Sequence, residues 1–311
     1  MSERDWISRY FKPLAVPEGA AGLTDDVAQL STGDAPLIVT TDALVEGVHF
    51  LSSDPIESVA RKLVRSNVSD ILSKGARPRE ALLSLAWPKD REEAELARFA
   101  EAFGEDLETW GAQLIGGDTT SSPHGLFLSL TLTGTCGPRG PVRRAGAREG
   151  DALWVTGEIG AACRGFHALQ SGRNQDEHVT AYRQPQLQPL TIAGLIHDHA
   201  TASMDVSDGL LGDARMLAEA SGLAVEVDLG AVPFAGGAAS LDERLELASW
   251  GDDYQVLFAG PATSAALISA EAREKGVRVT RIGAFSAGSG LTARLEEEHI
   301  NLPERLGFEH G

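Results

Sequence analysis

Aspartates recur in short motifs along the chain, most of them beside an apolar run. They are Asp26 in Thr24-Asp-Asp-Val-Ala, Asp42 in Thr40-Thr-Asp, Asp70 in Asn67-Val-Ser-Asp, Asp118 in Gly116-Gly-Asp-Thr-Thr, and Asp205 and Asp208 in Met204-Asp-Val-Ser-Asp-Gly. We expect them at the ends of strands and helices, where so many carboxylates can converge only if cations neutralise them. Mg²⁺ takes oxygen ligands and bridges protein carboxylates to substrate phosphates. The pattern therefore favours an enzyme that handles phosphates with several Mg²⁺ ions.

Each motif alone has a plainer interpretation. Thr40 and Thr41 add hydroxyls beside Asp42, but Thr-Thr-Asp is common where a strand ends in a turn. Ser207 or Asp208 could simply cap a helix that begins near Leu210. Caps and turns do not require several acids to gather, so the prediction depends on the whole set.

Three further side chains have open alternatives. His49 is either an ordinary histidine or a substrate contact. Arg144 either is a solvated charge or binds phosphate through its planar guanidinium group. Lys62, on the predicted helix that leads to Asp70, is either an exposed helix lysine or a phosphate contact.

Several other classes of site are excluded by missing motifs. The sequence contains no Gly-x-x-x-x-Gly-Lys-Ser/Thr, no Gly-x-Gly-x-x-Gly after a strand, and no His-Arg-Asp with Asp-Phe-Gly. It also lacks His-Glu-x-x-His and Gly-x-Ser-x-Gly. Phosphate chemistry here must use another scaffold.

Charge and composition limit the partners. The 311 residues carry a formal net charge of −18, which disfavours nucleic acid and anionic membrane surfaces. Two cysteines, Cys136 and Cys163, imply neither a disulfide framework nor a thiolate metal site. No apolar stretch reaches the length of a membrane span, and the N-terminus lacks a signal core, so we expect a cytoplasmic protein.

The elements that must position these residues alternate between strands and helices, which predicts an α/β or α+β class. Apolar spacing predicts helices at 55–74, 90–110, 161–170, 188–197, 210–220 and 262–274, and strands at 37–41, 81–87, 126–133, 152–156, 225–227, 255–258 and 277–282. The breakers in Gly137-Pro-Arg-Gly-Pro place a predicted boundary between domains 1–137 and 138–311.

Taken in order, the motifs resemble one family, the thiamine-monophosphate kinases. The resemblance adds Val45-Glu-Gly-Val-His-Phe, Arg144-Ala-Gly-Ala-Arg-Glu-Gly-Asp, Gly251-Asp-Asp-Tyr and Gly307-Phe-Glu-His to the acidic motifs. It covers nearly the whole chain. The wider superfamily includes aminoimidazole ribonucleotide synthetase, selenophosphate synthetase and the hydrogenase-maturation dehydratase.

The resemblance implies an aminoimidazole-ribonucleotide-synthetase-like two-domain fold, with the N-terminal sheet at a homodimer interface and a C-terminal α/β domain that closes over ATP. It implies transfer of the ATP γ-phosphoryl group to thiamine monophosphate, giving thiamine diphosphate and ADP. Family positions for Mg²⁺ match Asp26, Thr40, Thr41, Asp42, Asp70, Asp118, Asp205 and Asp208. ATP positions match Gly117, Asp118, Arg144 and Ser207, and thiamine phosphate positions match His49, Asp252 and Phe308.

The chain departs from the family around Asp252. The family usually has Gly-Gly-Glu-Asp-Tyr-Glu where this chain has Trp250-Gly-Asp-Asp-Tyr-Gln. An aminoimidazole ribonucleotide synthetase-like enzyme and a non-catalytic nucleotide or Mg²⁺ binding protein are the alternatives. Selenophosphate synthetases carry an N-terminal reactive Cys or selenocysteine, and the hydrogenase-maturation relatives a C-terminal Cys, whereas this chain has its first Cys at 136 and ends in Gly307-Phe-Glu-His-Gly.

Overall fold

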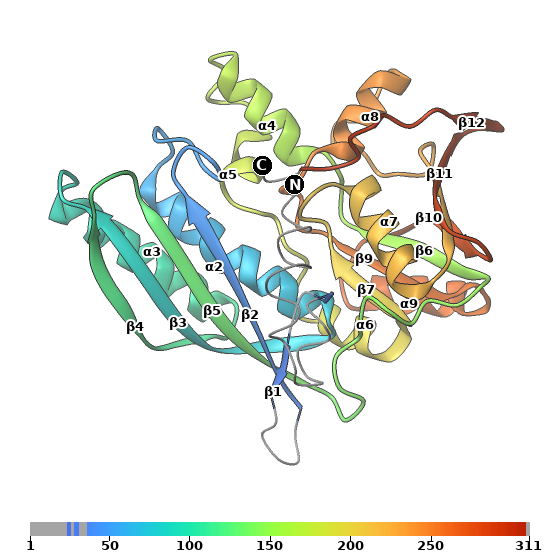
Figure 1. Ribbon diagram of the computed structural model, residues 1–311, viewed down its shortest axis with the longest axis horizontal. Coiled ribbons are helices and arrows are strands. Elements are labelled where there is room, and N and C mark those ends of the chain that lie inside the picture. Colours follow the sequence, from blue (N-terminus) through green and yellow to red (C-terminus); the bar gives the residue numbers. More distant parts are fainter. Residues whose placement is uncertain (1–23, 26–27, 31–35, 309–311) are drawn as a thin grey trace.

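The computed structural model describes residues 24–25, 28–30 and 36–308. The first half builds one sheet and two long helices. Its elements are β1 (Ala28–Leu30), β2 (Leu37–Val45), α2 (Ile56–Ser73), β3 (Ala76–Pro88), α3 (Glu93–Thr109), β4 (Gln113–Ser122) and β5 (Phe127–Cys136). The five strands form a sheet in the order β1-β2-β5-β3-β4 (Figure 1).

The second half builds a larger sheet with shorter helices around it. Its elements are β6 (Asp151–Thr156), α4 (Ala161–Gln170), α5 (Val179–Arg183), α6 (Ile192–His199), β7 (Ala202–Asp205), α7 (Leu210–Ser221), β8 (Ala224–Asp228), α8 (Leu241–Ser249), β9 (Val256–Pro261), a 3₁₀ turn (Ala262–Ser264), α9 (Ala265–Glu274), β10 (Val279–Ser286), β11 (Gly290–Leu295) and β12 (Glu298–Ile300). The seven strands have the order β12-β11-β8-β10-β6-β9-β7. The predicted boundary falls between β5 and β6, and the predicted two-domain α/β class is confirmed.

Helix α2 lies between the two sheets and is buried along most of its length. It contacts β2 and β5 on one side and β7 and β9 on the other. Because both sides are covered, even polar side chains such as Ser66, Asn67 and Ser69 are about 1% exposed or less. Burial on two sides removes the usual solvated face of a helix. The helix therefore packs into the core of both domains.

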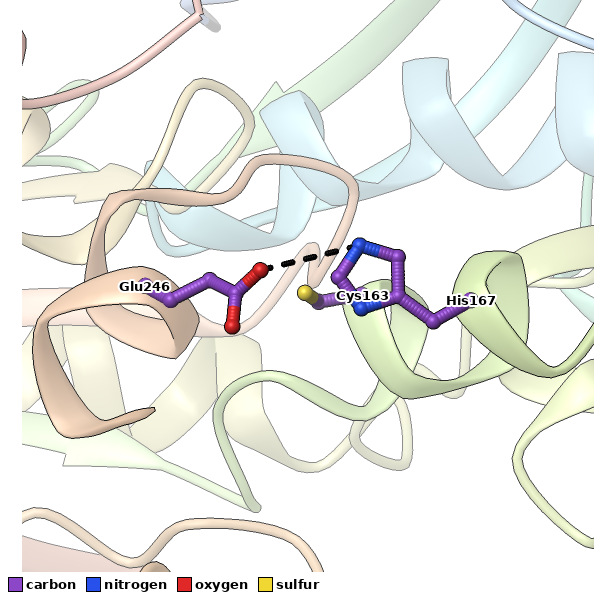
Figure 2. Close-up of side chains that lie close together, drawn as sticks. All are labelled: Cys163, His167 and Glu246. Atoms are coloured by element: carbon purple, nitrogen blue, oxygen red, sulfur yellow. Dashed lines mark ion pairs between the residues drawn. The ribbon is translucent and has the colours of Figure 1, made fainter. Parts of the chain in front are cut away.

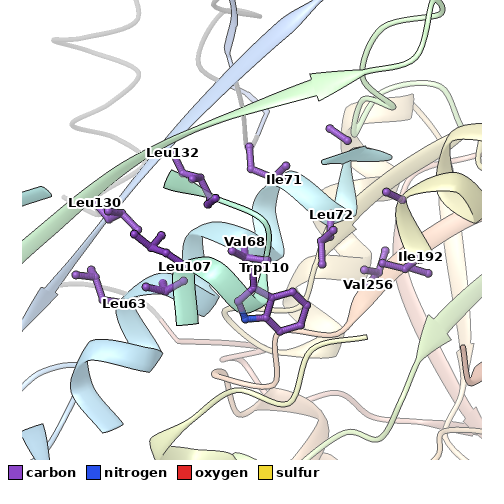
Figure 3. Packing of buried hydrophobic residues seen from close by; sticks show 14 of the residues in the cluster. Leu63, Val68, Ile71, Leu72, Leu107, Trp110, Leu130, Leu132, Ile192 and Val256 are labelled. Carbon is purple, nitrogen blue, oxygen red and sulfur yellow. The ribbon is translucent and has the colours of Figure 1, made fainter. Parts of the chain in front are cut away.

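The core around α2 is continuous across the domains. Figure 3 shows Leu72 of α2 close to Ile192 of α6 and Val256 of β9, while Leu130 and Leu132 of β5 pack near Leu63. Alternation along β5 explains the sheet side of this core, since Leu128, Leu130 and Leu132 are fully buried on one face.

Among the described residues, no helix covers the other face of the first sheet. Leu82 and Phe127, 45% and 41% exposed, lie on it because they alternate with the buried leucines of the paired strands. Leu114 and Ile115 of β4, 51% and 61% exposed, lie at the irregularity in its pairing with β3. Helices α2 and α3 cover the opposite face (Figure 1). We call this uncovered surface of β2, β5, β3 and β4 the open face.

The structure extends several predicted elements. Strand β2 continues past Asp42 to Val45, because β5 pairs with it as far as Val45 opposite Phe127. Asp42 is therefore a mid-strand residue and not the strand end that we expected. Helices α2 and α3 match the predicted spans within three residues at each end.

Candidate active site

A cavity of about 690 Å³ opens between the two domains. Residues from both halves of the chain line it. Eight of the predicted site residues are among them: Asp42, His49, Asp70, Asp205, Ser207, Asp208, Asp252 and Phe308.

Strand β2 and helix α2 position the carboxylates of the N-terminal domain. Thr40 and Asp42 are two residues apart on β2, so both side chains face α2. The Thr40 hydroxyl donates to Asp70 Oδ2 at 2.5 Å, and the Asp42 backbone N–H donates to Asn67 Oδ1 at 3.1 Å. These bonds fix β2 against α2, with Asp42 and Asp70 on the cavity wall.

The loop after β7 positions the carboxylates of the C-terminal domain. Asp205 is the last residue of β7, is 2% exposed and accepts a hydrogen bond from the Ser69 hydroxyl at 2.7 Å. Ser69 belongs to α2, so this bond joins the two domains. Asp208 lies just before α7, and its backbone carbonyl accepts from the Phe308 N–H at 2.8 Å.

A further carboxylate, Asp213, lies behind this group at the start of α7 and is completely buried. It accepts backbone hydrogen bonds from Asp208 at 3.3 Å and Gly209 at 3.2 Å. Burial, followed by the negative charges of Asp208 and Asp205, raises the pKa of Asp213 well above its ordinary value. Burial and two neighbouring carboxylates thus both disfavour ionisation of Asp213, and the Arg144 charge opposes them only in part.

Tyr254, which also lines the cavity, is affected by the same carboxylates. Burial raises its pKa well above the ordinary value, and the charges of Asp252, Asp42 and Asp205 raise it further. Carboxylates from both domains therefore act on one point. The donors are carboxylate and hydroxyl oxygens, which suit a hard divalent cation such as Mg²⁺ and not a thiophilic one. The residues present fit the metal that the sequence predicts.

Thr41, Gly117 and Asp118 do not join this group within one protomer. The Thr41 hydroxyl donates to the Leu130 carbonyl at 3.1 Å, and Asp118 pairs with Ser84 of β3 on the exposed strand β4. Paired residues point to the same side of a sheet, so Thr41 and Asp118 both lie on the open face.

Gly117 allows strand β4 to lie close to strand β3. Its φ is 155°, and a Cβ there would lie 1.9 Å from the Leu83 carbonyl oxygen. No side chain fits at that distance. The glycine that the family motif requires is therefore explained here by strand packing alone.

Arg144 lies near the acidic group but does not line the cavity. Its backbone N–H donates to Asp25 Oδ2 at 3.1 Å, and its charge acts on Asp213. Asp25 also pairs with the buried Lys74 at 3.1 Å. Asp26, the predicted metal ligand next in sequence, lies outside the described residues.

At the other end of the cavity, Lys62 is about 1% exposed and reaches across from α2. Its ammonium donates to Asp252 Oδ2 at 2.7 Å and to the His49 carbonyl at 2.8 Å. Lys62 is therefore not an exposed helix lysine, which was one of the two alternatives that its position in the sequence left open. Asp252 adopts φ 67°, a left-handed conformation that aspartate tolerates better than most residues.

Aromatic rings cover the wall beside Asp252. Trp250 packs against Phe166, with ring centroids 5.1 Å apart, and Tyr182 lies 5.5 Å from the other side of Phe166. Phe308, 46% exposed, lies beneath the Arg305 guanidinium at 5.8 Å. Carboxylates and aromatic rings thus line the same cavity, which suits a ligand with both phosphate and a flat cationic ring. We call the lining around Asp42, Asp70 and Asp205 the acidic end and the lining around Trp250 and Phe308 the aromatic end.

Sequence reasoning missed Ser69, Asp213 and Phe166, which hold or extend the predicted site. Asp213 gave a weak signal, because an acid in the first turn of a helix normally serves the helix end. Ser69 and Phe166 gave none, since their roles depend on contacts made between domains or between helices.

Two family models match this architecture. Residues 24–136 match the N-terminal domain of AIR synthase related protein, and residues 148–296 match its C-terminal domain. The fold and the acidic cavity between the domains thus define a member of the AIR synthase related class of two-domain proteins.

Known relatives narrow the class. A thiamine-monophosphate kinase of Caulobacter vibrioides is 38% identical over 323 residues, covering 100% of this chain and 91% of the relative. One of Escherichia coli is 30% identical, covering 98% and 96%. The solved structure described as AaThiL complexed with AMPPCP and TMP superposes with a TM-score of 0.84 at 28% identity, covering 100% of this chain and 97% of that one. The chain belongs to the thiamine-monophosphate kinase family, which confirms the predicted resemblance.

Within the described part of the chain, no helix is both long and apolar enough to cross a bilayer.

Proposed function

We propose that this protein transfers the γ-phosphoryl group of ATP to thiamine monophosphate and releases thiamine diphosphate and ADP. The observation that carries the proposal is one cavity lined both by carboxylates of the two domains and by aromatic rings. Support comes from the 38% identical kinase of the family and from the similar structure that holds AMPPCP, an ATP analogue, together with TMP.

The acceptor explains why the cavity needs no general base. A phosphate monoester has a second pKa of about 6, so its oxygen is already largely ionised at neutral pH. The reaction is opposed by the repulsion between two polyanions, ATP and thiamine monophosphate. The protein must align the acceptor oxygen with the γ-phosphate, and we propose a direct transfer without a phosphoenzyme. Retention of configuration at a chiral γ-phosphate would refute the direct transfer.

Mg²⁺ is the proposed cofactor. Asp42, Asp70, Asp205 and Asp208 would hold the ions on the cavity wall, and Asp26 is proposed as a further ligand by family resemblance. Bound Mg²⁺ supplies charge neutralisation between the carboxylates and the phosphates. Thr40 orients Asp70, and Ser69 orients Asp205, so both carboxylates are held before the ions arrive.

The aromatic end is proposed to take the thiamine moiety. Trp250 and Phe308 offer ring faces for a thiazolium cation or a pyrimidine, and His49 and Asp252 line the same space. Ser207 lines the acidic end, where the phosphates would lie. Gly117, Arg144 and Asp118 remain proposed ATP contacts on family resemblance.

We also propose a homodimer that pairs the open faces. Leu82 and Phe127 are exposed apolar side chains on this face of the sheet, and Leu114 and Ile115 are exposed on the adjoining edge strand β4. Exposed apolar surface of this kind often marks a protein–protein interface. The open face also carries Asp118 and Thr41. Use of ATP and two free cysteines support a cytoplasmic location, and the acidic composition supports the absence of nucleic acid and membrane partners.

The experiment that tests the function is product analysis. The purified protein is incubated with ATP, Mg²⁺ and thiamine monophosphate, and unphosphorylated thiamine is the parallel acceptor. We expect thiamine diphosphate and ADP in equal amounts with the monophosphate alone. ADP without thiamine diphosphate would refute the acceptor and point to Trp250 and Asp252, where the chain departs from the family.

The metal assignment has its own test in Asp42→Asn. The substitution removes a carboxylate from a group that repels itself, so the fold should survive and most turnover should be lost. Asp90→Asn, on the exposed turn before α3, is the matched control and should keep full turnover. Activity within about threefold of wild type, a change of under ~1 kcal/mol in the barrier, would show that Asp42 holds no catalytic ion.

A further inference from the structure

Three side chains of different chemistry converge at the edge of the cavity, outside the acidic group. Cys163 and His167 are four residues apart on α4, so they share one face of that helix. Glu246 reaches toward them from α8. His167 Nε2 lies 3.7 Å from Glu246 Oε1, and the ligand atoms of all three residues lie within 4.8 Å of one another (Figure 2).

These distances are close to those of a tetrahedral zinc site. Zinc bonds of about 2.0–2.2 Å to nitrogen and oxygen place such neighbouring tetrahedral ligands about 3.3–3.6 Å apart. The 3.7 Å between His167 Nε2 and Glu246 Oε1 is slightly longer than that. His167 and Glu246 are 44% and 53% exposed, so small side-chain rotations can close the remaining gap to the buried Cys163.

The ligand set differs in kind from the acidic group around Asp42. One sulfur, one imidazole nitrogen and one carboxylate oxygen are the donors that zinc accepts together, whereas Mg²⁺ takes oxygen. We propose that Cys163, His167 and Glu246 bind one Zn²⁺, with a fourth position left to water. The proposal departs at Cys163 from the expectation that the sequence implies no thiolate metal site.

Two plainer roles account for less of this geometry. A half-exposed His–Glu ion pair contributes little stability and gives no reason for a thiol to face it. A reactive cysteine is disfavoured because Cys163 is about 1% exposed, whereas reactive thiols are accessible.

The site would tie α4 to α8 at the rim of the cavity. Glu246, Phe166 and Trp250 line that cavity, and the His167 ring packs edge-on against Trp250 with centroids 5.4 Å apart. A bound ion would hold His167 and Glu246 in place and thereby fix the Trp250 wall. The binding itself does not depend on the proposed kinase reaction.

The test is a Co²⁺ titration of the full-length protein, stripped of metal with a chelator and then supplied with excess Mg²⁺. Cobalt in the acidic group gives no thiolate-to-metal charge-transfer band, so the band reports this site alone. We expect one equivalent to give the band and Zn²⁺ to displace it. Cys163→Ser should abolish the band, and Cys136→Ser, which alters the other cysteine, should keep it.

Cys163→Ser could fail to fold because the cysteine is buried, so variants of the two exposed ligands provide a second test. His167→Ala and Glu246→Gln change half-exposed side chains and should each weaken cobalt binding at least tenfold. The proposal is overturned if wild type shows no thiolate band, if the band survives Cys163→Ser, or if His167→Ala binds cobalt as wild type does.

Discussion

The ion pair between Lys62 and Asp252 should respond asymmetrically to loss of either partner. The Lys62 side chain is 2% exposed, whereas that of Asp252 is 26% exposed. Lys62→Met removes a charge that the protein had to desolvate, and water can still reach the remaining carboxylate. Asp252→Asn keeps the shape and tolerates the left-handed backbone, but it leaves a buried ammonium without a counter-charge.

The magnitudes follow from these environments. Loss of a partner for a fully buried charge costs about 3–5 kcal/mol, and the retained amide oxygen and the Tyr182 ring 4.6 Å away place Asp252→Asn at the lower end. A partly exposed group that loses one hydrogen-bonding partner costs about 1 kcal/mol, which is the expectation for Lys62→Met. In the double variant the buried charge is gone, so its cost should approach that of Lys62→Met alone.

Urea unfolding of the four proteins measures this cycle, with unchanged slopes as the control for two-state behaviour. We expect a coupling free energy of about 3 kcal/mol between the two positions, because the double variant should cost about 3 kcal/mol less than the sum of the single variants. If Lys62→Met destabilises more than Asp252→Asn, or if the two effects simply add, then burial of the lysine does not decide the energetics and the reasoning fails.

Three further predictions concern the fold. Leu82→Asp, on the open face, should convert a dimer to monomers in sedimentation, and an unchanged dimer would place the interface elsewhere. Gly117→Ala should cost about 2 kcal/mol or more in unfolding free energy, whereas Gly104→Ala in open space on α3 should be neutral or stabilising. Burial raises the pKa of Asp253 from 3.8 to about 8, so as pH rises through that interval the unfolded chain loses the proton before the folded one does. Wild type should then lose stability relative to Asp253→Asn by about 1 kcal/mol for each pH unit, and a pH-independent difference would contradict the shifted pKa.

The sequence was sufficient wherever one local pattern decided the outcome. The apolar spacing of α2 and α3 predicted both helices, because packing on a sheet imposes that spacing. The gathering of Asp42, Asp70, Asp205 and Asp208 was also predictable, since no other arrangement explains so many acids at the ends of apolar runs.

Features that depend on pairing between distant segments were not predictable. The side of the sheet on which Asp118 lies depends on the register between β3 and β4. Lys62 is buried because Asp252, 190 residues away, meets it. Helix α8 was not predicted because its charged residues obscure a short apolar stripe. The proximity of Glu246 to Cys163 was therefore not predicted either.

The position of α2 between the sheets has a consequence for how the molecule comes apart. Separating the domains would expose the fully buried Lys74, whose ammonium donates to the Ser203 carbonyl at 2.6 Å, as well as Ser69 and Asp205. Unfolding of either domain alone would therefore expose one buried side of α2 to water. Calorimetry should record one cooperative transition, and the amides of α2 should exchange with solvent only through global unfolding.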